Sequence, residues 1–120
     1  MNKPIIPSHL VAPKTERQQQ SLFALLSAHL ILWAFEQGYE LTYGDAFDTD
    51  GDGGHMKGTV HGNRMAIDLN LFIKAALQMS SEAHAPIGAY WKSLHPLCRW
   101  GGDFKKPDGN HYSLAFQGKA

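Results

Sequence analysis

Apolar and polar residues alternate between positions 64 and 71. Such period-two alternation is typical of a β-strand that buries one face. The apolar side comprises Met65, Ile67, Leu69 and Leu71, and the opposite side comprises Arg64, Ala66, Asp68 and Asn70. Residues 111–116 repeat the pattern, with Tyr112, Leu114 and Phe116 on the apolar side and His111 on the other. If both strands join one sheet, Asp68 and His111 share its polar face and can meet there.

Two more residues can reach the same place. His61 lies seven positions before Asp68, which a continuous strand would put on the opposite face, but the Gly62-Asn63 pair supplies a bend. Asp108 opens a turn sequence just before His111, so its carboxylate can curl back toward the pair. Two histidines and one carboxylate are the ligands of a hydrolytic zinc site that keeps one position open. The spacing therefore predicts that His61, Asp68 and His111 hold zinc beside Asp108.

These two segments resemble the zinc peptidases that include D-alanyl-D-alanine carboxypeptidases and the L-alanyl-D-glutamate endopeptidases of phage endolysins. Residues 59–68 are similar to that family's Ser-x-His-x-x-Gly-x-Ala-x-Asp pattern, and residues 108–111 to its acidic-x-x-His pattern. The Trp100-Gly101-Gly102 segment resembles the phage branch. The resemblance implies His61, Asp68 and His111 as zinc ligands and Asp108 as the general base. It also implies an α+β fold of the Hedgehog and D,D-peptidase type.

The chain departs from the family pattern at two positions. Thr59 stands where the pattern has serine and keeps its hydroxyl, whereas Arg64 stands where the pattern has glycine. Family members often carry an arginine upstream of the first ligand, but no arginine occurs between Arg17 and Arg64. One hypothesis is that Arg64, on the strand face of Asp68, supports the negative charge that develops during the reaction. The other is that Arg64 is a solvated or salt-bridged edge residue.

An acidic segment offers a second candidate metal site. Asp48, Asp50, Asp52 and Gly53 match the first half of a calcium-binding loop. The twelfth position is Thr59 instead of glutamate, so the bidentate closing ligand is missing. We therefore favour an acidic loop at the rim of the cleft over a calcium site.

Composition excludes several classes of function. Eleven basic and eleven acidic residues give a formal net charge of zero, which removes the electrostatic footprint of a nucleic-acid-binding protein. A single cysteine, Cys98, excludes an internal disulfide and leaves nitrogen and oxygen as the zinc donors. No secretory signal pattern is evident, and the apolar run near residues 22–35 is too short for a membrane span. We expect a monomer made in the cytoplasm.

The remaining sequence predicts one domain. Residues 1–14 hold three of the six prolines and form an extended arm, and residues 15–120 form a single peptidase domain. A helix is expected from the N-cap Thr15 to residue 37, with Gly38 as its stop. A strand over residues 39–43 follows. After the Asp68 strand, residues 71–79 are expected to extend it and turn into a short helix, and another helix is expected from Pro86. The histidines outside the site are treated as ordinary surface or helix residues without a role: His9, His29, His55, His84 and His95.

The sequence thus predicts an α+β domain whose small, mainly antiparallel sheet carries helices on one face and zinc on the other. The function that the resemblance implies is hydrolysis of a peptide bond in bacterial peptidoglycan, with the L-alanyl-D-glutamate bond of an endolysin favoured. Such an enzyme acts at the cell wall on the peptidoglycan stem peptide. A D-alanyl-D-alanine carboxypeptidase is the nearest alternative. A catalytically silent, metal-binding structural module is the alternative from another class.

Overall fold

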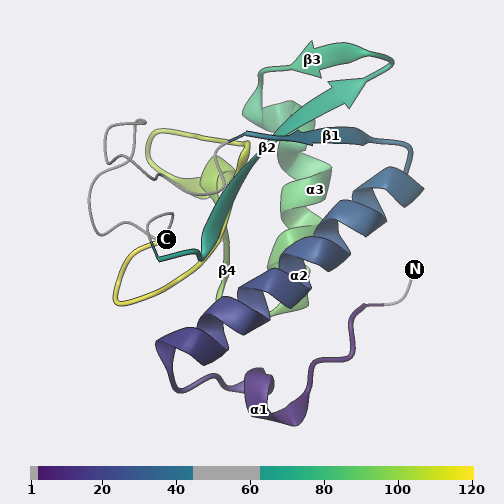
Figure 1. Ribbon diagram of the computed structural model, residues 1–120. Helices are drawn as coiled ribbons and strands as arrows, with labels where there is room; N and C mark the ends of the chain where they lie inside the picture. Colours follow the sequence, from purple (N-terminus) through teal and green to yellow (C-terminus); the bar gives the residue numbers. More distant parts are fainter. Residues whose placement is uncertain (1–2, 45–62) are drawn as a thin grey trace.

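The computed structural model describes residues 3–44 and 63–120 and shows an α+β fold. Its elements follow in the order α1 (Ser8–Val11), α2 (Glu16–Glu36), β1 (Glu40–Tyr43), β2 (Ala66–Ile73), β3 (Ala76–Gln78), α3 (Ser81–Leu94), β4 (Cys98–Trp100), a 3-10 helix η1 (Gly101–Asp103) and β5 (His111–Leu114). The expected extended arm contains α1, a single helical turn whose Leu10 is buried (Figure 1).

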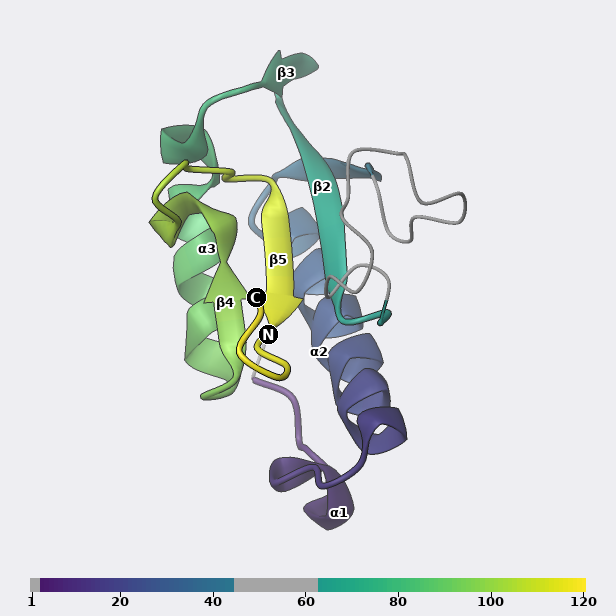
Figure 2. The same cartoon turned by 90° about the vertical axis from the view of Figure 1, so that its left-hand side faces the viewer.

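The five strands form one antiparallel sheet. The strand order is β1-β2-β5-β4, and β3 pairs with the end of β2. The long helices α2 and α3 both lie behind this sheet when β5 and β2 face the viewer (Figure 2). The predicted architecture, a small antiparallel sheet accompanied by helices, is confirmed.

Helix α2 begins after the predicted N-cap and ends at Glu36, one residue before the predicted end. The Thr15 hydroxyl accepts a hydrogen bond from the Gln18 backbone N–H at 3.1 Å, and the Gln18 side chain in turn accepts from the Thr15 N–H at 3.2 Å. This reciprocal capping box satisfies donors that the first helical turn leaves open. Gly38 ends the helix with φ of 92°, a left-handed conformation that glycine adopts without steric cost.

The segment between β2 and α3 differs from the prediction. Residues 71–79 were expected to extend the Asp68 strand and turn into a short helix. The strand does continue to Ile73, but the chain then turns back at Lys74 and Ala75 to form β3 in place of a helix. Both turn residues have positive φ, 50° and 66°, as two-residue hairpin turns require. Helix α3 begins at Ser81 and not at Pro86, because the Ser80 hydroxyl caps it by accepting from the Ala83 N–H.

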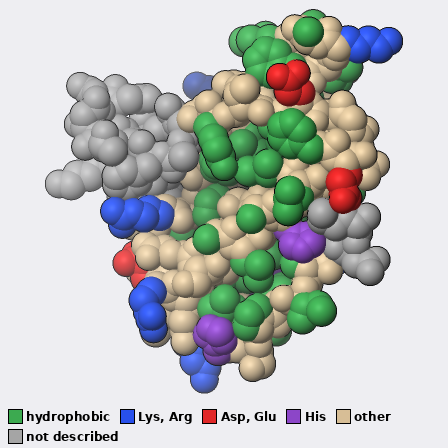
Figure 3. Space-filling view, turned by 45° about the vertical axis from the view of Figure 1, so that its right-hand side comes forward, with side chains coloured by type: hydrophobic (Ala, Val, Ile, Leu, Met, Phe, Trp, Pro, Cys, Tyr) green, Lys and Arg blue, Asp and Glu red, His purple; other side chains and the backbone are tan. Residues whose placement is uncertain are grey.

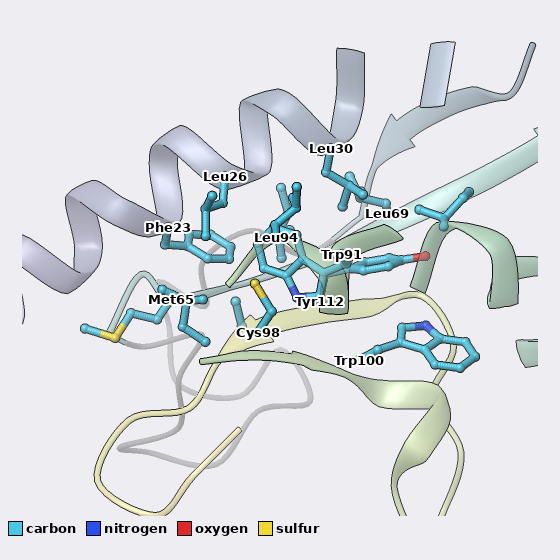
Figure 4. Packing of buried hydrophobic residues seen from close by; sticks show 14 of the residues in the cluster. Phe23, Leu26, Leu30, Met65, Leu69, Trp91, Leu94, Cys98, Trp100 and Tyr112 are labelled. Carbon is cyan, nitrogen blue, oxygen red and sulfur yellow. The ribbon is translucent and has the colours of Figure 1, made fainter. Parts of the chain in front are cut away.

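The core lies between the sheet and the two long helices (Figure 4). Trp91 of α3 is fully buried and meets the ring edges of Phe23 from α2 and Tyr112 from β5. The predicted apolar face of β2 is confirmed, because Ile67, Leu69 and Leu71 are all buried here. Burial of this face forces the intervening residues of β2 toward the opposite side of the sheet.

Several hydrophobic side chains stay exposed on the face that α2 presents (Figure 3). An apolar groove there is lined by residues of α2, β1 and β2, among them Phe35 and Tyr43. None of the helices within residues 3–44 and 63–120 combines the length and the hydrophobicity of a membrane span.

Candidate metal centre

Asp68 and His111 are brought together by the pairing of β2 with β5. The two residues are direct partners in the antiparallel register, and the Asp68 Oδ1 and His111 Nδ1 atoms lie 3.6 Å apart. Their side chains are 14% and 7% exposed. A carboxylate and an imidazole held this close in a partly dry site can share a proton or a cation. The prediction that they meet on the polar face of one sheet is confirmed.

Asp108 approaches this pair from the loop that precedes β5. Its backbone N–H donates to the Gly101 carbonyl at 2.8 Å, and its own carbonyl accepts from the His111 N–H at 3.1 Å. The loop passes so close to η1 that a Cβ atom at Gly101 would lie 2.0 Å from the Asp108 carbonyl oxygen. These backbone contacts therefore fix the position from which the Asp108 side chain extends.

The three side chains form a cluster that fits a metal ion. One donor atom from each of Asp68, Asp108 and His111 lies within 4.8 Å of the others. Two ligands of a tetrahedral zinc ion lie roughly 3.4 Å apart, because each ligand atom is about 2.1 Å from the metal. The 3.6 Å between the Asp68 and His111 atoms is close to that spacing. The donor set of carboxylate and imidazole also suits zinc.

Other predicted site residues are placed differently or not described. His61 lies outside the described residues, as do Asp48, Asp50 and Asp52 of the acidic segment. Arg64 lies in a turn and is exposed, so the expectation that it shares the strand face of Asp68 is wrong. Its φ of 60° is left-handed and incompatible with extended backbone, which is why β2 begins only at Ala66.

A pocket of about 220 Å³ adjoins the cluster on the side of Asp108. Its wall combines the residues after Pro107 with the β3 hairpin and the first turn of α3, including Gln78, Ser81 and His84. The pocket has apolar lining from Leu77 and hydrogen-bonding side chains beside it. Asp108 belongs to both the cluster and the pocket, so a molecule bound in the pocket would lie beside the candidate metal centre.

His84 is the site residue that the sequence analysis missed. It was expected to be an ordinary surface or helix residue ahead of the helix at Pro86, but it lies on α3, is only 2% exposed and has its Nδ1 atom 2.8 Å from the Tyr112 hydroxyl. Burial lowers the pKa of His84 below its ordinary value, while the Asp108 carboxylate and a hydrogen bond to the Gln78 backbone oppose that shift. The sequence pattern could have predicted the burial of His84, because His84, Ile87 and Trp91 recur at the spacing of the core-facing side of a helix.

No family model matches this sequence, and no curated protein matches it.

Proposed function

We propose that this protein is a zinc-dependent peptidase that hydrolyses a bond in the stem peptides of bacterial peptidoglycan. The L-alanyl-D-glutamate bond is the favoured target, as in an endolysin. The observation that carries the proposal is the convergence of Asp68, His111 and Asp108 from two strands and a loop. The same three residues occupy the ligand and base positions of the family that the sequence resembles.

In this proposal Asp68 and His111, together with His61, hold the zinc ion. Bound zinc supplies a Lewis acid for the scissile carbonyl and a water whose pKa is lowered to about 7. Asp108 is exposed at the mouth of the site, where its carboxylate can accept the proton of the attacking water. The same group then carries that proton to the leaving amine, whose residue occupies the adjoining pocket.

The backbone at position 64 supports the resemblance independently of the ligands. The family pattern has glycine at this position, and Arg64 adopts φ of 60°, the left-handed region that favours glycine. The close approach of Gly101 to Asp108 likewise explains the need for glycine in the Trp100-Gly101-Gly102 segment. Both features are properties of the local backbone geometry that do not depend on zinc.

One observation favours a second candidate, a metal-binding module without catalysis. The Asp108 donor atom lies close enough to those of Asp68 and His111 to serve as a ligand itself. If Asp108 coordinated the metal, no carboxylate would be left over as the base. The site would then bind a metal ion without catalysing hydrolysis.

The experiment that tests the proposed function is mass spectrometry of fragments released from peptidoglycan by the zinc-loaded protein. Fragments with a new amino terminus on glutamate establish the endopeptidase, and loss of only a terminal D-alanine establishes the carboxypeptidase. An Asp108→Ala variant is the control and releases neither product. If the folded, zinc-loaded wild type releases no fragment, the peptidase proposal is overturned and the binding module takes its place.

A further inference from the structure

A chain of buried polar contacts lies directly behind the candidate metal centre. The Trp100 indole N–H donates to the Gly109 carbonyl at 2.7 Å, and the Tyr112 hydroxyl lies 2.8 Å from His84 Nδ1. Tyr112 is fully buried, and its hydroxyl points to the same side of the core as the Trp100 indole nitrogen (Figure 4). These contacts connect α3, β4 and β5 with the loop that carries Asp108.

Strand register links these two contacts. Trp100 and Tyr112 are direct partners in the β4–β5 register, so their side chains lie next to each other on one face of the sheet. The Tyr112 hydroxyl and His84 Nδ1 form one hydrogen bond, and the tautomer of the ring decides which of the two donates. The buried His84 and Tyr112 pair therefore lies beside the Trp100 indole that holds the Gly109 carbonyl.

The chain ends beside the residue that the reaction depends on. Gly109 follows Asp108 directly, and it packs so tightly on α3 that an added Cβ would lie 2.5 Å from the Ser81 Cα atom. Gln78, His84 and Gly109 all line the pocket that Asp108 shares. The network therefore fixes the back of the pocket and the root of the Asp108 loop at the same time.

We infer that His84 and Tyr112 are positioning residues for Asp108. They hold the Trp100 indole, whose N–H holds the Gly109 carbonyl, and the loop in turn keeps the Asp108 carboxylate in reach of the Asp68 and His111 pair. This inference rests on the proposed function, in which Asp108 is the base. A displacement of about 1 Å at a catalytic group can lower the rate about 100-fold, so small losses of alignment are measurable.

The test compares Tyr112→Phe, which removes one hydroxyl, with wild type on soluble peptidoglycan fragments. We expect kcat to fall at least about tenfold while KM and zinc affinity stay nearly constant. Replacing His84 with leucine removes both ring contacts and lowers kcat at least as far. His84→Asn retains an acceptor near the Nδ1 position and restores most of the lost rate.

The matched control is Gln19→Met. This variant also removes one hydrogen bond, the one that Gln19 Nε2 donates to the Ala115 carbonyl at 2.6 Å. Ala115 directly follows β5, at the end of that strand remote from Asp108. We expect Gln19→Met to lower thermal stability about as much as Tyr112→Phe and to leave kcat unchanged. A wild-type kcat for Tyr112→Phe, or an equal loss in Gln19→Met, would overturn the inference.

A second readout separates this inference from the proposed substrate. Acetohydroxamic acid binds zinc and offers a proton to a neighbouring carboxylate, so its affinity for the zinc-loaded protein reports where Asp108 lies. Tyr112→Phe and Asp108→Asn should each weaken its binding about tenfold, whereas Gln19→Met should not. If wild type leaves peptidoglycan intact, the proposed function falls, and the hydroxamate comparison alone supports or overturns the role of His84 and Tyr112.

Discussion

Asp68 and His111 stand directly opposite each other in the β2–β5 ladder, with Oδ1 and Nδ1 3.6 Å apart. Their meeting is therefore a consequence of strand register and not of side-chain flexibility. A slip of one residue would move every β2 side chain to the other face of the sheet and separate the pair. Because Ile67 and Leu69 are buried on the core face, hydrophobic burial enforces the register that assembles the site.

Loss of either member of this pair should remove the metal. We expect Asp68→Ala and His111→Ala to weaken zinc binding by more than about 100-fold, since even partners of ligands contribute about 10-fold to 100-fold. Competition with a fluorescent chelator measures the affinity. The exposed His9 provides the control, and His9→Ala should bind zinc like wild type. Wild-type affinity in Asp68→Ala would exclude this carboxylate as a ligand.

A methyl group at Gly101 should dislodge the Asp108 loop. The added Cβ of Gly101→Ala would lie 2.0 Å from the Asp108 carbonyl oxygen and 2.8 Å from the His111 Cβ. We expect a loss of stability of about 1–3 kcal/mol, as in other overpacked sites, together with loss of activity. Chemical denaturation and fragment release measure the two effects.

Gly118→Ala is the control for that substitution, because Gly118 has φ of 77° and an added Cβ would meet nothing within 4 Å. It should cost about 1 kcal/mol in backbone strain and leave activity unchanged. Equal activity losses in both variants would contradict the proposed contact between Gly101 and Asp108.

Arg64 can be separated into its backbone cost and its charge. Its φ of 60° is unfavourable for a residue with a side chain, so Arg64→Gly should stabilise the fold by about 1 kcal/mol. If the guanidinium supports developing negative charge, the same variant should lose at least about tenfold in kcat, and Arg64→Lys should lose less. Unchanged kcat in Arg64→Gly would mean that Arg64 is a solvated or salt-bridged residue without a role in the reaction.

Acid should destabilise the protein through His84. Burial holds the pKa of His84 below 6.5, although the Asp108 carboxylate and the Gln78 backbone raise it in part. As pH falls below 6.5, the unfolded chain binds a proton at this position that the folded protein does not, so the free energy of unfolding decreases. Denaturation of zinc-free protein should show a shallower decrease for His84→Asn than for wild type. Identical slopes would mean that His84 does not contribute.

Much of the fold follows from local signals in the sequence. The alternation across β2 and the Thr15 cap each report a local preference that packing reinforces, and both predictions are confirmed. The β3 hairpin was not predicted because its two turn positions are occupied by Lys74 and Ala75. Glycine or asparagine at these positions would have indicated left-handed turn residues. The pairing of β3 with β2 on either side of the turn holds that conformation.

In the candidate site, too, local signals could be predicted from the sequence and contacts between distant segments could not. Asp68 and His111 could be paired from alternation, since strand faces are a local property. The burial of His84 could be predicted from helical spacing, but its role could not, because its partner Tyr112 comes from a strand distant in the sequence. Arg64 was wrongly predicted to share the strand face of Asp68, because the alternation of residue types extends beyond the point where the backbone leaves the sheet.

The role of Asp108 as the base is tested by measuring zinc content and turnover together in Asp108→Asn, which keeps the size of the side chain and removes its basicity. We expect this variant to retain zinc at the wild-type affinity and to release no peptide fragments from peptidoglycan. Loss of zinc in the folded variant would show that Asp108 is a ligand, and wild-type turnover would show that it is not the base. Either result would contradict the assignment of this carboxylate to proton transfer beside the Asp68 and His111 pair.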